Sequence, residues 1–185
     1  MLFNTVLSAQ TVSFTIKVFG SKVGRMDVTR VHQPDGTDLY TMQSNSHIKF
    51  LWITKDYTSK FEARYKDGKL LSASHVEKEA GNIKRWSTVT ADGANYVVDS
   101  DKGRRTFAEP PKNCDLTMYF EDCRKIKRLF YVAEANFNDV TKIDDTCFEF
   151  KSSDGHRNVY HCQNGEIKQM EFHLPIATVY MDKVQ

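Results

Sequence analysis

Glycines that follow Asp or Asn recur along this chain and constrain its fold more than any other feature. Asp-Gly and Asn-Gly favour two-residue type I′ turns, because both central residues of such a turn need a positive φ. Each dipeptide therefore predicts an antiparallel hairpin. The dipeptides are Asp35-Gly36, Asp67-Gly68, Asp92-Gly93, Asp154-Gly155 and Asn164-Gly165.

The segments between these turns have the alternation of strands with one buried face. Apolar side chains at Val12, Phe14, Ile16 and Val18 alternate with polar ones, which predicts a strand over residues 11–19, with residues 23–33 returning from it. Residues 146–152, 157–163 and 166–174 predict a second meander. Counting outward from the turns predicts these facing pairs: Phe61 with Ser74, Tyr65 with Leu70, Ser87 with Val98, Val89 with Tyr96, Phe148 with His161, Phe150 with Val159, and Val159 with Met170.

Composition supports a β fold. Val, Ile, Thr, Phe, Tyr and Trp total 60 of the 185 residues, whereas Ala and Leu total 19. One short helix is predicted over residues 115–121, with Asp115 as its N-cap. A sheet of about ten hairpin-connected strands has to curl, because strand twist accumulates. We therefore expect an all-β fold with one or two short helices: a large curved antiparallel meander that forms a half-open barrel, in a single domain over residues 11–185.

Residues 1–10 stand apart from the strand pattern. They lack a basic n-region but end near the small pair Ser8-Ala9, where a cleavage site would fit. Two interpretations are open: a signal-peptide remnant whose true start lies upstream, and a frayed terminus. The first predicts export to the periplasm or cell surface, and a cytoplasmic location is the alternative.

The four cysteines, Cys114, Cys123, Cys147 and Cys162, allow three disulfide pairings. They contain no C-x-x-C spacing, which argues against a zinc ribbon and a thioredoxin-type site. A two-residue turn at Asp154-Gly155 sets Cys147 opposite Cys162, with Cα atoms about 5.5 Å apart and within disulfide range. Cys114 and Cys123 flank a short segment and form a second candidate pair.

The predicted strands supply a candidate binding site. A barrel of about eight strands is just filled by its own side chains, so a wider half-barrel can enclose an apolar cavity for acyl chains or similar ligands. The alternative is that the same side chains form an ordinary core. The candidate ligand-binding residues are Phe14, Ile16, Val18, Phe61, Tyr65, Val89, Tyr96, Phe148 and Phe150.

The sequence gives no reason to expect an enzyme. The motifs G-x-S-x-G, G-x-x-x-x-G-K-[ST] and G-x-G-x-x-G are absent. A metal site at Cys147, His161 and Cys162 is disfavoured, because adjacent strand residues point to opposite faces. We expect no cofactor and no metal, and a hydrolase or isomerase at the barrel mouth is the least favoured alternative.

One dense basic run, Arg124-Lys125-Ile126-Lys127-Arg128, has two interpretations. Lysines on a solvated edge strand prevent aggregation between sheets. The same run could dock on an anionic membrane or on a partner protein. A net charge of +2 and the lack of interleaved aromatic residues argue against nucleic-acid binding. The oligomeric state is not indicated.

Three segments in the C-terminal third carry a resemblance. They are LTMYF at residues 116–120, FEFKSSDG at residues 148–155 and VYHCQNGEIK at residues 159–168. Over residues 114–174 the chain resembles a family of uncharacterised exported bacterial proteins, which are similar in architecture to the periplasmic lipoprotein carriers. The resemblance implies a half-barrel around a hydrophobic cleft for lipid, closed by several short helices, of which this chain offers one candidate.

These observations predict the non-enzymatic binding of a lipid or other hydrophobic small molecule in an apolar cleft. The alternative is a binding or scaffold module whose barrel is filled by its own side chains and which acts through its surface.

Overall fold

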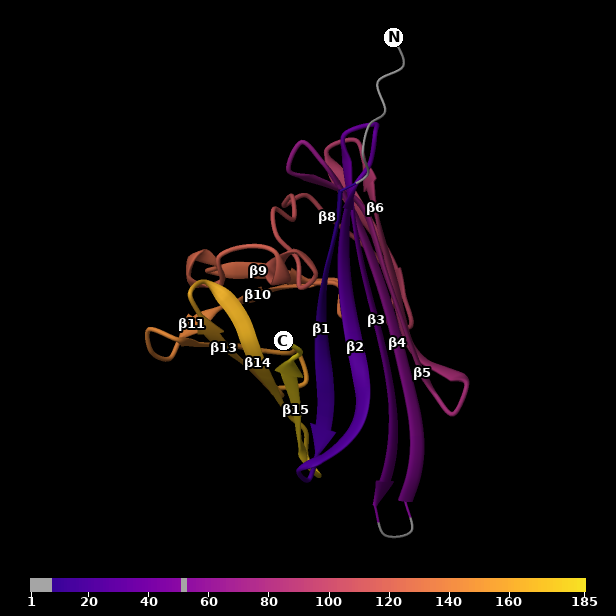
Figure 1. Cartoon of the computed structure of the whole chain (residues 1–185). Helices are drawn as coiled ribbons and strands as arrows, with labels where there is room; N and C mark the ends of the chain where they lie inside the picture. Colours follow the sequence, from indigo (N-terminus) through magenta and orange to yellow (C-terminus); the bar gives the residue numbers. More distant parts are fainter. Residues whose placement is uncertain (1–7, 51–52) are drawn as a thin grey trace.

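The computed structural model describes residues 8–50 and 53–185, and these form an all-β fold (Figure 1). The strands are β1 (Ser8–Val18), β2 (Ser21–His32), β3 (Thr37–Phe50), β4 (Ile53–Lys66), β5 (Lys69–Glu79), β6 (Asn82–Asp92), β7 (Asn95–Ser100), β8 (Gly103–Phe107), β9 (Arg128–Tyr131), β10 (Asn136–Asp139), β11 (Thr141–Lys142), β12 (Cys147–Lys151), β13 (Arg157–Gln163), β14 (Glu166–His173) and β15 (Thr178–Lys183).

Thirteen of these strands form one antiparallel sheet, and β9 pairs with β10 in a second, two-stranded sheet. The order in the large sheet is β11-β12-β13-β14-β15-β1-β2-β3-β4-β5-β6-β7-β8. Two runs of consecutive hairpins are thus joined where β15 pairs with β1, with Ile16 facing Met181. The sheet curves but does not close, because β8 and β11 lie at its two ends (Figure 1). This confirms the predicted half-open antiparallel barrel.

A segment between β8 and β11 packs against the inner face of the sheet. We call residues 114–139 the inner segment; it contains η1 (Thr117–Tyr119), η2 (Cys123–Lys125) and the β9–β10 hairpin. The helix predicted over residues 115–121 is therefore one short 3-10 turn, η1, and the second turn, η2, follows outside the predicted range. Asp115 is not the N-cap of η1: Leu116 occupies that position, and the Asp115 Oδ1 accepts a hydrogen bond from the backbone N–H of Val132 at 3.3 Å instead.

Ring contacts connect the inner segment to strands across the whole sheet. The centroid distances are 5.6 Å for Phe14–Tyr119, 5.8 Å for Tyr40–Phe120, 5.4 Å for Phe107–Phe130 and 5.4 Å for Tyr131–Phe150. Side chains of the sheet and of the inner segment consequently form one continuous core.

Two of the predicted type I′ turns are confirmed by their backbone angles. Asp67 and Gly68 have φ of 51° and 71°, and Asn164 and Gly165 have φ of 54° and 82°. Tyr65 faces Leu70 as predicted, but a bulge between Arg64 and Tyr65 sets Phe61 opposite His75 instead of Ser74.

Two other hairpins have a register that differs from the prediction. The β6–β7 loop is Gly93-Ala94, since Asp92 still pairs with Asn95; Val89 therefore faces Val98, and Ser87 faces Ser100.

The β12–β13 loop is longer than predicted and comprises residues 152–156, closed by a hydrogen bond from Ser152 N–H to the His156 carbonyl at 3.0 Å. The observed pairs are Phe148 with Tyr160 and Phe150 with Asn158. A bulge after His161 also shifts β14, so that Val159 faces Glu171 and Tyr160 faces Met170.

The chain start is described only from Ser8 onward. The predicted segment at residues 1–10 lies outside the described residues as far as position 7, and residues 8–10 belong to β1, where they pair with residues 30–32. Across residues 8–50 and 53–185, no helix has the length and apolar character needed to cross a bilayer.

Candidate functional site

All nine candidate ligand-binding side chains are buried, with exposed fractions between 0 and 9%. Eight of them belong to a single core cluster, and Val18 is buried at the end of β1. The structure therefore brings these residues together, but the inner segment covers them. Phe14 contacts Tyr119, and Phe150 contacts Tyr131. As a ligand site the nine residues stay a prediction, one that requires the inner segment to move.

The inner segment is fixed to the sheet by polar contacts as well as by packing. The Ser87 hydroxyl donates to the Val132 carbonyl at 2.6 Å in a fully buried position. The Arg105 guanidinium, on the edge strand β8, donates to the carbonyls of Glu134 and Ala135. These bonds satisfy carbonyl groups that would otherwise lack a hydrogen-bond donor. They therefore stabilise the inner segment in its position against the sheet.

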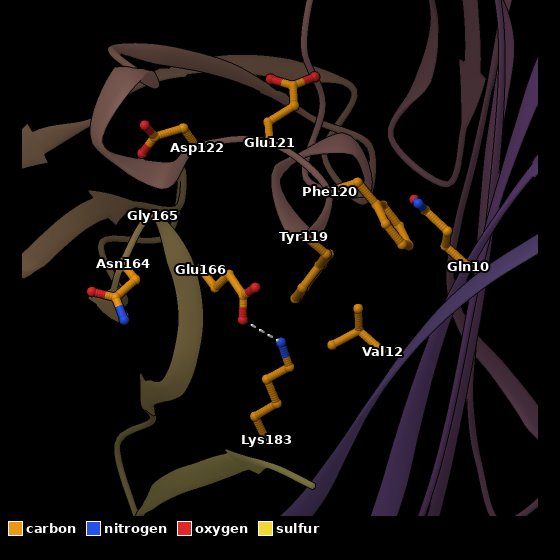
Figure 2. A pocket seen from close by; sticks show the side chains of 10 residues that line it. All are labelled: Gln10, Val12, Tyr119, Phe120, Glu121, Asp122, Asn164, Gly165, Glu166 and Lys183. Atoms are coloured by element: carbon orange, nitrogen blue, oxygen red, sulfur yellow. Dashed lines mark hydrogen bonds and ion pairs between the residues drawn. The ribbon is translucent and has the colours of Figure 1, made fainter. Parts of the chain in front are cut away.

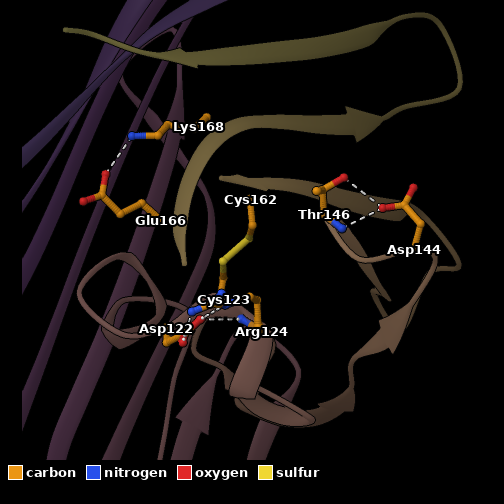
Figure 3. Close-up of a disulfide and its surroundings, with 8 residues drawn as sticks. All are labelled: Asp122, Cys123, Arg124, Asp144, Thr146, Cys162, Glu166 and Lys168. Atoms are coloured by element: carbon orange, nitrogen blue, oxygen red, sulfur yellow. Dashed lines mark hydrogen bonds and ion pairs between the residues drawn. A yellow bond between two sulfur atoms is a disulfide. The ribbon is translucent and has the colours of Figure 1, made fainter. Parts of the chain in front are cut away.

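One disulfide, Cys123–Cys162, also ties the inner segment to β13, with Cα atoms 6.6 Å apart (Figure 3). The Cys123 N–H donates to the Gly165 carbonyl at 3.0 Å, which brings η2 to the β13–β14 turn. Both predicted pairings are wrong. Cys147 faces His161 because of the longer β12–β13 loop, and Cys114 and Cys147 are buried free thiols. Burial raises the pKa of the Cys114 thiol to about 12.

A pocket of about 380 Å³ opens where β1, β14, β15 and the inner segment meet (Figure 2). We call it the seam pocket. Its position follows from the β15–β1 pairing, which brings the start of β14 and the end of β15 beside β1. It is lined by Gln10, Val12, Tyr119, Phe120, Glu121, Asp122, Asn164, Gly165, Glu166 and Lys183.

One wall of the seam pocket is apolar and the rest is charged. Val12, Tyr119 and Phe120 form the apolar wall (Figure 2). The Tyr119 hydroxyl donates to the Met170 sulfur at 3.3 Å, which directs its polar end into the core. Amphipathic pockets of this kind bind ligands that combine an apolar body with a polar end.

Two of the three carboxylates on this lining are held in ion pairs. The Lys168 and Lys183 ammonium groups lie 2.7 and 2.8 Å from the Glu166 carboxylate and lower its pKa to about 2. The Arg124 guanidinium, 2.7 Å away, lowers the pKa of Asp122 to about 2.

Glu121 differs from these two carboxylates. Among residues 8–50 and 53–185 no basic side chain forms an ion pair with it. Burial raises the pKa of Glu121, and a hydrogen bond with Thr117 and the charge of Arg30 oppose that shift.

A second groove, of about 620 Å³, lies on the outer face of β2 to β5. We call it the outer groove. Its side chains are mainly polar, and Arg25 and Asp27 form an ion pair there at 2.8 Å. Phe61 is the one predicted site residue among its lining residues, and none of the nine lines the seam pocket.

Two buried titratable groups were missed as such by sequence reasoning. Burial raises the pKa of Asp115 to about 7 and lowers the pKa of His75 to about 4. Neither residue lines the seam pocket or the outer groove. Only the fold reveals their burial, since a lone Asp before a helix-like segment and a lone His in a strand are common surface features.

The basic run at residues 124–128 is interspersed with acidic partners. Arg124 pairs with Asp122, Arg128 lies 2.7 Å from Glu109, and Ile126 is buried in the core. Its role in docking stays a prediction. In the described part of the chain, no group of three or more His, Cys, Asp or Glu side chains is arranged to hold a metal ion.

Comparison with solved structures shows a shared fold. The chain is similar to the β-barrel-like protein of the domain of unknown function DUF1849 from Brucella abortus, with a TM-score of 0.58 and 11% identity over 97% of this chain and 96% of the other. That match shows the fold alone. The matched protein is not described as a lipoprotein carrier, the class of protein whose architecture the sequence resemblance implied. No curated protein matches the chain. The family model of a domain of unknown function, DUF6134, matches residues 14–184, and the chain therefore belongs to the DUF6134 family.

Proposed function

We propose that this protein is a non-enzymatic binding module that acts through its surface, with the seam pocket as its binding site. The observation that carries the proposal is that the hollow of the half-barrel is occupied by the chain itself. Leu116, Phe130 and Val132 of the inner segment are fully buried in the same core as Phe14 and Phe150. A ligand that binds without unfolding this core has to bind at the surface.

Lipid carriage in the interior is the second candidate. It is favoured by the continuous apolar face, built from the nine predicted residues, that lies beneath the inner segment. An acyl chain reaches that face only if the inner segment leaves. The Cys123–Cys162 disulfide and the Ser87–Val132 hydrogen bond oppose that movement.

The lining of the seam pocket suggests what it binds. Asp122 and Glu166 are held in ion pairs with Arg124, Lys168 and Lys183. Glu121 lies beside the aromatic wall without an ion-pair partner among the described residues, and an unpaired carboxylate next to aromatic rings suits a cation with an apolar stem. Its volume of about 380 Å³ suits a small ligand group rather than a folded domain. We therefore propose that the ligand is a Lys or Arg side chain of a partner polypeptide, with its cationic end at Glu121 and its stem against Phe120.

Native mass spectrometry of the oxidised protein, purified without detergent, tests whether the interior is empty of ligand. The expected result is the mass of the chain alone. A stoichiometric acyl lipid that leaves only after collisional activation would overturn the surface-binding proposal and favour lipid carriage.

Peptide binding tests the pocket itself. Immobilised tripeptides with a central Lys, Arg, Ala or Glu are probed with the wild type, Glu121→Gln, Phe120→Ala and, as a control in the outer groove, Glu62→Gln. We expect retention on the Lys and Arg peptides that falls severalfold in the first two variants and is unchanged in the control. Equal retention on all four peptides would contradict the proposal.

A further inference from the structure

Two neighbouring turns at one end of the sheet expose apolar side chains. One is the β1–β2 turn at Phe19-Gly20, and the other is the β14–β15 loop at residues 174–177. Val18 pairs with both Ser21 and Val179, so the two turns lie side by side (Figure 1). We call these two turns together the apolar tip.

The side chains of the apolar tip are well exposed. Phe19, Leu174 and Ile176 have exposed fractions of 52, 48 and 85%. The loop is held in shape by a hydrogen bond from the Leu174 N–H to the Ala177 carbonyl at 3.1 Å. Single exposed apolar residues are normal on a protein surface, but three on adjacent protruding turns mark a contact site.

One basic side chain at the apolar tip, Lys22, is not balanced by an acidic group of the described residues. Neither residues 17–24 nor residues 172–181 contain an Asp or Glu. His173 is balanced by Glu171 at 3.2 Å, and Lys17 by Asp182 at 2.7 Å. Lys22 is exposed and has no ion-pair partner among the described residues. An anionic surface therefore complements the tip.

The shape of the apolar tip decides between a protein and a bilayer. A stable protein interface buries about 800 Å² on each partner and needs about 20 to 30 residues, far more than two turns supply. A bilayer accepts protruding apolar side chains one by one, each gaining its own transfer free energy. Basic residues beside them add attraction to anionic headgroups.

We propose that the apolar tip inserts into the headgroup region of a lipid bilayer that carries anionic lipid. This membrane contact is separate from the seam pocket and from the basic run at residues 124–128. It orients the molecule with β1, β2, β14 and β15 end-on to the bilayer.

Vesicle co-sedimentation of the full chain tests the proposal. The wild type is mixed with phosphatidylcholine vesicles, with and without phosphatidylglycerol, and compared with the double variant Leu174→Ser/Ile176→Ser. The control is Ile143→Ser, because Ile143 is also 48% exposed but lies in the β11–β12 loop. We expect the double variant to bind at least about tenfold more weakly and the control to bind like the wild type.

Lys22→Gln tests the electrostatic part. The wild type should prefer the anionic vesicles by roughly fivefold, and this variant should lose most of that preference. Circular dichroism and thermal unfolding check that every variant is folded. Vesicle binding by the double variant equal to that of the wild type would overturn the proposal, as would no binding of the wild type. A wild-type dimer that the double variant dissociates, with no vesicle binding, would show that a second copy covers the tip.

Discussion

The His75 ring stacks on the Phe61 ring, with centroids 4.1 Å apart and an angle of 33° between the planes. His75 is fully buried, and neither of its ring nitrogens has a hydrogen-bond partner in the described structure. The Ser87 hydroxyl, which faces it across the strands, donates instead to Val132. Burial therefore stabilises the neutral imidazole and lowers its pKa from 6.5 to about 4.

Because of His75, the free energy of unfolding should decrease as the pH falls from 6.5 to about 4. In this range the unfolded chain binds a proton that the folded chain excludes. At pH 4.5 the loss is roughly 2 to 3 kcal/mol relative to neutral pH. Urea unfolding of the wild type and His75→Leu at pH 7.5 and pH 4.5 measures it. Between these two pH values, the free energy of unfolding of the wild type should fall by roughly 2 to 3 kcal/mol more than that of the variant. An equal fall in both proteins would show that the low pKa does not belong to His75.

Asp115 should act in the opposite sense. Burial raises its folded pKa from 3.8 to about 7, so the folded state holds its proton more tightly. Its stabilising contribution is complete below the unfolded pKa and is lost as the pH rises towards 7, by roughly 3 to 4 kcal/mol. Asp115→Asn keeps an acceptor for the Val132 N–H and should abolish this pH dependence. The readout is the free energy of unfolding between pH 4 and pH 8. An Asn variant with the wild-type slope would show that Asp115 does not titrate in this range.

Removing the Cys123–Cys162 disulfide should destabilise the fold. Cys123 and Cys162 are 39 residues apart, and closing a loop of that length in the unfolded chain is worth about 4 kcal/mol. Cys123→Ser/Cys162→Ser should lower the free energy of unfolding by that order in urea titrations.

In the folded wild type, Cys114 and Cys147 should resist maleimide and react after unfolding, because both are buried. Peptide mapping that finds Cys147 in a disulfide would contradict the pairing.

Gly24 should not tolerate a side chain. A Cβ at this position would lie 2.1 Å from the Asn45 carbonyl oxygen on β3, so β2 and β3 would have to separate. We expect Gly24→Ala to lower the free energy of unfolding by about 1 to 3 kcal/mol or more. Val23→Ala, at the neighbouring position, is the control for an ordinary change in the strand. Thermal unfolding that finds Gly24→Ala as stable as this control would refute the close approach.

The all-β architecture was accessible to sequence reasoning because alternation and turn chemistry are local signals. The β4–β5 and β13–β14 turns adopted the angles that their Asp-Gly and Asn-Gly dipeptides favour. The turns at Phe19-Gly20 and Ala80-Gly81 also have two positive φ values, but their first residues give no such signal. Bulges are set by twist and by neighbouring strands, so the shifts after Arg64 and His161 were not predictable from local patterns.

The candidate site was harder to predict than the fold. Period-two patterning identified the inward residues, but it could not show that the inner segment, residues 114–139, returns to cover them. The seam pocket assembles residues from positions as distant as Gln10 and Lys183, which only the β15–β1 pairing brings together. The predicted disulfide pairing is wrong because the five-residue β12–β13 loop, in place of a two-residue turn, shifts the register by one residue and sets Cys147 opposite His161 instead of Cys162.

The pairing of β15 with β1 also has a consequence for biosynthesis. β1 is translated before the other described strands, yet the edge of β1 that pairs with β15 gains its full partner only when residue 183 has been translated. Until then, a nascent chain with β1 to β8 already paired presents an open strand edge, a template for wrong partners. We therefore expect this fold to mature after translation, with docking of the C-terminal hairpins as the late step that seals that edge.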